Sequence, residues 1–247
     1  MIKYILLGII QGVTEFLPIS SSAHLLIAQR VFGLSGEEIA ISIVLHLGTL
    51  FAVMVFFFKD ILKTLRDIKL SLLLLLTTAI TVVIGVLGKD FFEGLFTSPK
   101  AVAVSFMVTG IILLMTRKFM DAKKEKVGLK DAFILGFTQA VAIIPGISRY
   151  GMTISTLLFR RINKEACFKF SFLVSIPVIL GAALLESRKV DFALQKDFAN
   201  LAFGFIASVI TGLLSLLILK LVIKHSKFYY FGYYCIVAAI LTIIFVK

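Results

Sequence analysis

Long runs of apolar residues, separated by short polar segments, dominate the hydrophobic pattern of the chain. A helix of about 20 apolar residues crosses the hydrocarbon core of a bilayer. The pattern therefore predicts six membrane-spanning helices, at residues 39–58, 70–87, 101–116, 170–185, 201–219 and 228–246.

Two further apolar stretches, residues 4–32 and 131–160, are interrupted in the middle by Pro18 and Pro145. Proline ends or kinks a helix because it lacks an N–H and clashes with the preceding turn. Each half is about a dozen residues long, which is too short to cross a bilayer. We expect two re-entrant helical hairpins, each returning to the side from which it entered.

Composition fixes the class of protein. The 247 residues are 60% hydrophobic and only 16% charged, with a mean hydropathy of +1.05. A soluble domain has no means of burying so much apolar surface, so the chain is expected to be an integral membrane protein. The net charge of +12 is carried by short loops between the apolar runs, which is the membrane pattern and not that of a nucleic-acid-binding protein.

The basic residues also predict the orientation. With both broken stretches re-entrant, 17 of the 26 lysines and arginines fall on one side and eight on the other, and Arg149 belongs to neither. Cytoplasmic loops are enriched in Lys and Arg. The first hairpin is then expected to open outward and the second inward.

The two broken stretches resemble each other: "LGIIQGVTEFLPISSS" at 7–22 and "LGFTQAVAIIPGISRY" at 135–150 align Gln11 with Gln139 and Pro18 with Pro145. Repeats that enter from opposite faces form inverted repeats whose broken helices meet near the midplane. The predicted fold is a single all-α polytopic membrane domain, 1–247. Its repeat halves are about 1–116 and 131–247, joined by the basic cytoplasmic loop 117–130.

Polar residues gather at the two breaks. Gln11 and Glu15 are four residues apart, on one helix face, and a carboxylate at membrane depth marks a functional site. Residues 20–22 are expected to form the N-cap and first turn of one returning helix, and Ser148 to stand at the start of the other. Helix N-termini favour anions. Arg149 adds a bidentate donor suited to phosphate.

A carboxylate beside a phosphate is repelled unless a divalent cation lies between them. Glu15, helped by Gln11, is therefore predicted to hold Mg²⁺ or Ca²⁺. His24 is expected to supply acid–base or nucleophilic chemistry near neutral pH. His46, inside a predicted span, reads equally well as a packed histidine, and His225 as a surface residue. These pieces together predict phosphoryl transfer from an anionic lipid.

The segments "QGVTEFLPISSSAH" and "PGISRYGMT" resemble the two signature motifs of the bacterial undecaprenyl-diphosphate phosphatases, the family tied to bacitracin resistance. The resemblance runs along essentially the whole chain, including "HLGTLFAV" and "FSFLVSIP". It implies an enzyme of the bacterial inner membrane that hydrolyses undecaprenyl diphosphate with a divalent cation, recycling the lipid carrier of peptidoglycan synthesis. It also implies a site open to the periplasmic face.

Carried onto this sequence, the resemblance assigns catalysis to Glu15, Ser21, His24 and Arg149, and substrate binding to Gln11, Ser22, Ser148, Arg149 and Thr153. The expected partners are the polyprenyl diphosphate and membrane lipid, without nucleic acid, and a homodimer is left open. Whether Ser21 or His24 is the nucleophile is also left open.

The sequence departs from the family pattern at three positions. Gln11 stands at the first acidic position, which leaves Glu15 as the one evident carboxylate ligand. Tyr150 replaces a small serine after the arginine, and Lys169 precedes "FSF", where an acidic or neutral residue is expected.

Two other functions compete. A type 2 phosphatidic acid phosphatase would need a histidine and an aspartate after Arg149, and the only histidine there is His225, in a loop. An inverted-repeat transporter or lipid flippase without hydrolysis would suit the same architecture, because fold alone does not separate enzyme from transporter.

Overall fold

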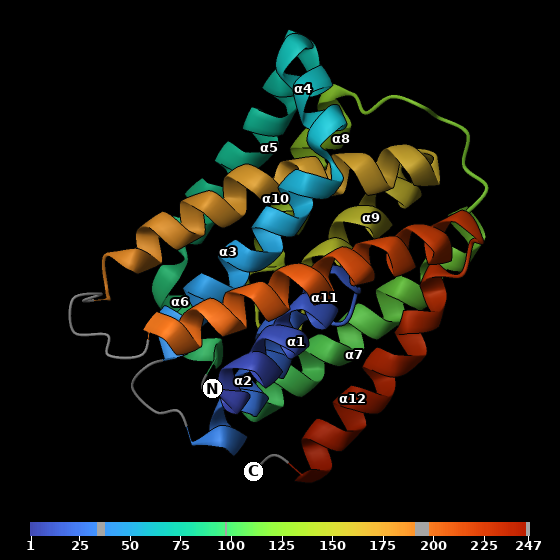
Figure 1. The fold of residues 1–247 in the computed structure, drawn as a ribbon. Helices are drawn as coiled ribbons and strands as arrows, with labels where there is room; N and C mark the ends of the chain where they lie inside the picture. Colours follow the sequence, from blue (N-terminus) through green and yellow to red (C-terminus); the bar gives the residue numbers. More distant parts are fainter. Residues whose placement is uncertain (34–37, 97, 191–197, 246–247) are drawn as a thin grey trace.

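Helices account for the regular structure of the chain in the computed structural model, which describes residues 1–33, 38–96, 98–190 and 198–245 (Figure 1). The described part contains no β-strand, and one isolated parallel bridge pairs Lys124 with Ile162. The expectation of an all-α membrane protein is confirmed.

The helices fall into long apolar rods and shorter pieces. The long ones are α3 (Glu38–Phe56), α5 (Ile68–Leu87), α7 (Pro99–Met115), α10 (Lys164–Ser187) and α11 (Phe198–Lys224). The shorter ones are α1 (Ile2–Phe16), α2 (Ser21–Phe32), α4 (Phe58–Arg66), α6 (Lys89–Phe96), α8 (Leu129–Val141), α9 (Arg149–Phe159) and α12 (Phe231–Phe245), with the 3₁₀ turns η1 (Thr116–Phe119) and η3 (Phe228–Tyr230).

Five helices of the described chain are long and apolar enough to cross a membrane, and each coincides with a predicted span. The sixth prediction, 228–246, corresponds to the shorter apolar segment Phe228–Ile244, and Val246 lies outside the described residues. Large apolar side chains on these helices face outward, among them Leu72, Leu75 and Val83 on α5. Such exposed apolar surface is what a bilayer covers.

Both predicted helix breaks are present. The helix α1 ends at Phe16 and α2 begins at Ser21, so the first break contains Pro18. The helix α8 ends at Val141 and α9 begins at Arg149, so the second contains Pro145.

The contacts between helices occur in matched pairs. The first broken helix α1 packs along α11, and its counterpart α8 packs along α5. In the same way α3 packs on α11 and α10 on α5, while α7 pairs with α12 (Figure 1). This arrangement is what two repeat halves would produce, and the inverted repeat stays a prediction.

Glycine allows the closest of these approaches. A Cβ on Gly12 would lie 2.0 Å from Oγ1 of Thr211 and 2.7 Å from the backbone nitrogen of Gly212 on α11. Small residues of this kind let membrane helices pack backbone to backbone. The helix α1, which carries Glu15, is thereby held closely against α11.

The basic loops predicted to share one side of the membrane lie at one end of the molecule. Four contacts join them: Lys124 with Ile162, Lys164 with Lys224, Lys169 with Asp60, and Arg117 over the ring of Tyr229. The loops on that side are therefore neighbours in space, although they are distant in sequence.

Candidate active site

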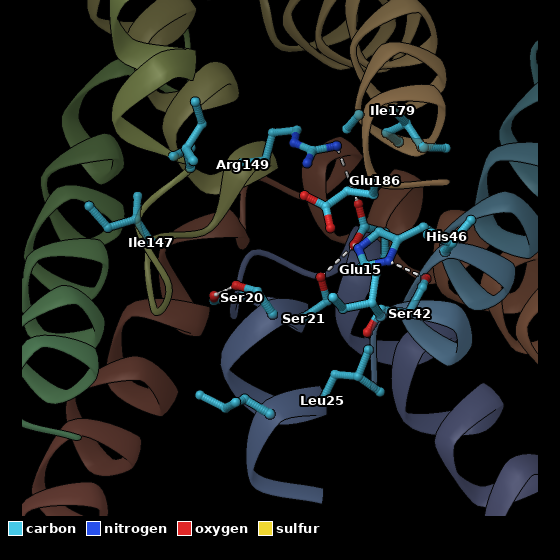
Figure 2. A pocket seen from close by; sticks show the side chains of 18 of the residues that line it. Glu15, Ser20, Ser21, Leu25, Ser42, His46, Ile147, Arg149, Ile179 and Glu186 are labelled. Carbon is cyan, nitrogen blue, oxygen red and sulfur yellow. Dashed lines mark hydrogen bonds and ion pairs between the residues drawn. The ribbon is translucent and has the colours of Figure 1, made fainter. Parts of the chain in front are cut away.

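A cavity of about 600 Å³ lies where the two broken helices meet. Its polar lining residues include Glu15, Ser20, Ser21, Ser42, His46 and Arg149 (Figure 2). Ser22 and Ser148 line it as well. Apolar side chains, including Leu25, Ile43 and Ile179, line the remainder. The cavity thus combines a polar end with walls that suit a hydrocarbon chain.

One hydrogen bond connects the two breaks. The backbone N–H of Gly146 donates to Oγ of Ser20 over 3.1 Å. Ser20 precedes α2 with φ +65°, and its side chain makes no capping bond. Ser20 thus occupies the N-cap position of α2 as expected, but its hydroxyl bonds the other half of the chain and not its own helix. Gly146 has φ +94°, and a Cβ there would lie 2.6 Å from the carbonyl oxygen of Val102, so only glycine fits.

Ser148 caps α9 as predicted. Its Oγ accepts the N–H of Gly151 over 3.1 Å, and its own N–H donates to Oγ1 of Thr109 on α7 over 3.3 Å. The same Oγ1 donates to the carbonyl of Gly146 over 3.1 Å. The turn that presents Arg149 to the cavity is thus held from two helices.

Glu15 lies at the centre of the polar end, on the buried face of α1. Its Oε2 accepts a hydrogen bond from Nε2 of Gln11 over 3.1 Å, as the four-residue spacing predicts, and a second one from the hydroxyl of Ser21. Nε2 of His46 on α3 lies 3.6 Å from the same oxygen. The carboxylate side chain is only 3% exposed.

Arg149 forms an ion pair with this carboxylate but no hydrogen bond to it. Its Nη1 lies 3.7 Å from Oε1 of Glu15, and it has no hydrogen-bond partner among the described residues although it is buried. A buried guanidinium N–H without an acceptor costs free energy that an anion in the cavity would recover. The arginine is therefore placed to receive an anionic group beside Glu15.

His24 lies outside the cavity. Its Nδ1 is 2.7 Å from the carbonyl oxygen of Ser20, and its Nε2 is 2.7 Å from the hydroxyl of Tyr234 on α12. A carbonyl only accepts, so Nδ1 carries a proton, and in the neutral ring Nε2 accepts from Tyr234. The ring also stacks on Tyr234 and meets Phe106 edge-on. The structure thus does not bring His24 to the Glu15 cluster.

The other predicted site residues divide in the same way. Ser21 and Ser22 line the cavity. Thr153 is buried one helical turn after Arg149, and its hydroxyl donates to the backbone carbonyl of Arg149 over 3.0 Å. Thr153 does not line the cavity. Gln11 reaches the site through Glu15.

Two departures from the family pattern have structural explanations. The buried Tyr150 stacks on Phe172 with ring centroids 4.0 Å apart, and its hydroxyl donates to Oγ of Ser175 over 2.8 Å. Lys169 pairs with Asp60 of α4 at 3.5 Å. Neither residue lines the cavity.

Sequence reasoning left His46 undecided, and the structure places it in the cavity against Glu15. His46 begins the segment "HLGTLFAV", which contributed to the family resemblance but was given no role in binding or catalysis. Glu186 near the end of α10 also lines the cavity and was not singled out (Figure 2).

The donor set bears on the predicted cation. Glu15 and the amide oxygen of Gln11, which is buried without a hydrogen-bond partner, are the oxygen ligands that hard divalent cations prefer. Within the described residues, no three His, Cys, Asp or Glu side chains gather closely enough to hold a metal ion. The residues fit a cation whose shell is completed by phosphate oxygens and water.

Comparison with known proteins finds relatives along nearly the whole chain. A family model described as bacitracin resistance protein BacA matches residues 4–241. The chain is 39% identical to an undecaprenyl-diphosphatase of Carboxydothermus hydrogenoformans, covering 93% of this chain and 91% of the relative. It is 37% identical to undecaprenyl-diphosphatases of Halothermothrix orenii, covering 98% and 96%, and of Methanococcus maripaludis strain C5, covering 98% of each chain.

Proposed function

The chain belongs to the bacitracin resistance protein BacA family, and from this premise we propose that it hydrolyses undecaprenyl diphosphate at the cavity beside Glu15. The products are undecaprenyl phosphate and inorganic phosphate. The reaction would recycle the lipid carrier of peptidoglycan synthesis and confer bacitracin resistance. The observation that carries this proposal is the buried, unbonded Nη1 of Arg149 opposite Glu15.

Arg149 binds the terminal phosphate in this proposal. Its free Nη1 and the N-terminus of α9 supply positive potential at one place in the cavity. The backbone that carries Arg149 is fixed before substrate arrives, because Ser148 caps the helix that begins with Arg149. Donors that are already oriented stabilise the charge that develops on the phosphoryl oxygens.

Ser21 is the better placed of the two candidate nucleophiles. Its hydroxyl donates to Glu15 inside the cavity, whereas both ring nitrogens of His24 are engaged outside it. Oγ of Ser21 attacks the terminal phosphorus and its proton passes to Glu15. The bond from that phosphorus to the bridging oxygen breaks, and undecaprenyl phosphate leaves. Water then cleaves the phosphoserine, the proton returns from Glu15 to Ser21, and phosphate is released.

Glu15 and Gln11 would hold the divalent cation, Mg²⁺ or Ca²⁺. When bound, the cation supplies neutralisation of the phosphate charge beside the carboxylate. Glu15 in turn is oriented by Gln11 and by the packing of α1 on α11.

The proposed location is the bacterial inner membrane with the cavity open to the periplasm. The cavity reaches Gln29 and Ile39 on one side and Glu186 and Lys189 on the other, at the helix ends away from the basic loops. Basic loops lie in the cytoplasm, which leaves the cavity facing outward. A homodimer stays a prediction, and the proposed chemistry takes no residue from a second copy.

The test is phosphate release from undecaprenyl diphosphate by the purified protein in detergent, with and without a chelator. We expect cation-dependent release by the wild type that is lost in Glu15→Ala and Arg149→Ala. If folded wild-type protein supplied with cation releases no phosphate, the proposal fails, and transport of the lipid across liposomes becomes the function to measure.

A further inference from the structure

All three histidines make the same local hydrogen bond but differ in what their second nitrogen meets. In each, Nδ1 lies 2.7–2.8 Å from the carbonyl oxygen four residues earlier, those of Ser20, Ser42 and Leu221. Because a carbonyl only accepts, Nδ1 carries the proton and the neutral ring keeps its lone pair on Nε2. Nε2 of His24 meets the hydroxyl of Tyr234, and the His225 bond is exposed. Nε2 of His46 points toward a carboxylate.

The distance between His46 and Glu15 does not suit a hydrogen bond. Nε2 and Oε2 are 3.6 Å apart, whereas a charge-assisted N–H···O bond closes to about 2.7–2.9 Å. Two ligand atoms of a single transition-metal ion, with bonds of about 2.0–2.2 Å each, are separated by such a gap when the angle between the bonds is wide. In the neutral form of His46, the Nε2 lone pair faces the carboxylate, and a cation bound by both would remove their repulsion.

We infer that His46 is a nitrogen ligand of the divalent cation, with Glu15 as its oxygen partner. The inference rests on the proposed function, which places a cation at Glu15. Metal-binding histidines typically donate their other N–H to a carbonyl or carboxylate, and His46 donates to Ser42. Both residues line the cavity, and the His46 side chain is 26% exposed, so a hydrated ion has access to it (Figure 2).

The consequence is a change in metal preference. Carboxylate and water ligands suit Mg²⁺, Ca²⁺ and Mn²⁺, and an added imidazole ligand favours first-row transition metals over Mg²⁺. Gln11 occupies the position of a second carboxylate in the family motif, so His46 would supply the donor that this substitution removes. We expect the protein to bind Mn²⁺ more tightly than Mg²⁺.

The test is Mn²⁺ binding followed by pulsed electron paramagnetic resonance, in which a directly bound ¹⁴N modulates the echo. We expect this nitrogen signal in the wild type and in the loop variant His225→Gln, and its loss in His46→Gln. We also expect His46→Gln to weaken Mn²⁺ binding about tenfold or more, and Mg²⁺ binding by less. If His46→Gln fails to fold, absence of the nitrogen signal in the wild type still overturns the inference.

Mn²⁺ bound without a nitrogen signal, or equally well by folded His46→Gln, would overturn the inference and identify His46 as a charged partner of Glu15. The absence of Mn²⁺ binding would overturn it as well. Phosphate release is measured on the same wild-type sample. Release without the nitrogen signal refutes the ligand role alone, whereas failure to release phosphate refutes the proposed function.

Discussion

Glu15 and Asp131 are both buried carboxylates beside an arginine, and their surroundings are opposite. At Asp131, in the first turn of α8, Oδ2 accepts Nζ of Lys124 and, over 2.9 Å, the N–H of Gly128, while Oδ1 accepts Nε of Arg160 over 2.8 Å. At Glu15 the arginine lies 3.7 Å away with Nη1 unbonded. Asp131 has bonded donors at both oxygens, and Glu15 faces a cavity.

The difference separates a structural carboxylate from a functional one. A buried charge that is fully hydrogen-bonded holds its neighbours in place and is costly to remove. A buried charge whose arginine approaches it without a hydrogen bond leaves a guanidinium N–H free to bind a further group. Both carboxylates lie close to an arginine, so proximity alone does not mark an active site. The distinguishing feature is the buried Nη1 of Arg149, which has no hydrogen-bond acceptor.

The largest expected effect is on activity, at Glu15. Glu15→Gln keeps the size of the side chain but removes the proton acceptor and cation ligand, so we expect phosphate release to fall about 10³-fold. The free energy of unfolding should change by less than about 1 kcal/mol, because the cavity already leaves this group incompletely bonded. Steady-state kinetics and thermal unfolding in detergent measure the two.

Asp131→Asn should show the reverse. The new amide NH₂ is a donor and would face Lys124, Gly128 or Arg160, which are donors themselves and lose an acceptor. We therefore expect the free energy of unfolding to fall by about 3 kcal/mol. Activity per folded molecule should stay within about twofold of wild type. Loss of activity in the folded fraction would mean that Asp131 and its partners take part in catalysis. The distinction between a structural Asp131 and a functional Glu15 would then be wrong.

The two arginines give a matched pair. Arg149→Lys replaces a planar bidentate donor by a point charge, and we expect about a 10²-fold loss of activity with little change in stability. Arg160→Lys should leave activity unchanged and lower stability by about 1 kcal/mol. Equal losses of activity in both variants would contradict the assignment of phosphate binding to Arg149.

We expect the smallest effect on activity and stability from the partly exposed ion pair of Lys169 and Asp60, which serves as a control for the buried pairs. Lys169 lies 3.5 Å from Asp60, and its side chain is 54% exposed. Solvent screens such pairs, so Lys169→Ala should change the free energy of unfolding by less than about 1 kcal/mol and leave phosphate release intact. A larger destabilisation would mean that the partly exposed Asp60 contributes to stability as the buried Asp131 does, and that burial does not distinguish them.

Local rules explain which parts of the structure were predictable. Pro18 and Pro145 dictate the helix breaks, and the four-residue spacing places Gln11 beside Glu15, because both effects act within one or two turns. The hydroxyl of Ser20 could not be assigned, because its partner Gly146 lies 126 residues away.

The same limit applies to the histidines. His24 bonds Tyr234, 210 residues later, and no spacing in the sequence foretells that contact. His46 sits on α3 among apolar residues, and only the packing of α3 near α1 brings it to Glu15. Tertiary contacts therefore decide which histidine belongs to the cavity.

The order of synthesis gives the distance between Glu15 and Arg149 in the chain a further meaning. Asp131 follows Lys124 by seven residues and precedes Arg160 by 29, so its neutralising charges leave the ribosome almost together. Arg149 follows Glu15 by 134 residues, which at about 5–20 residues per second takes about 7–27 s. Through that interval the nascent N-terminal half holds its membrane carboxylate without the arginine that will face it.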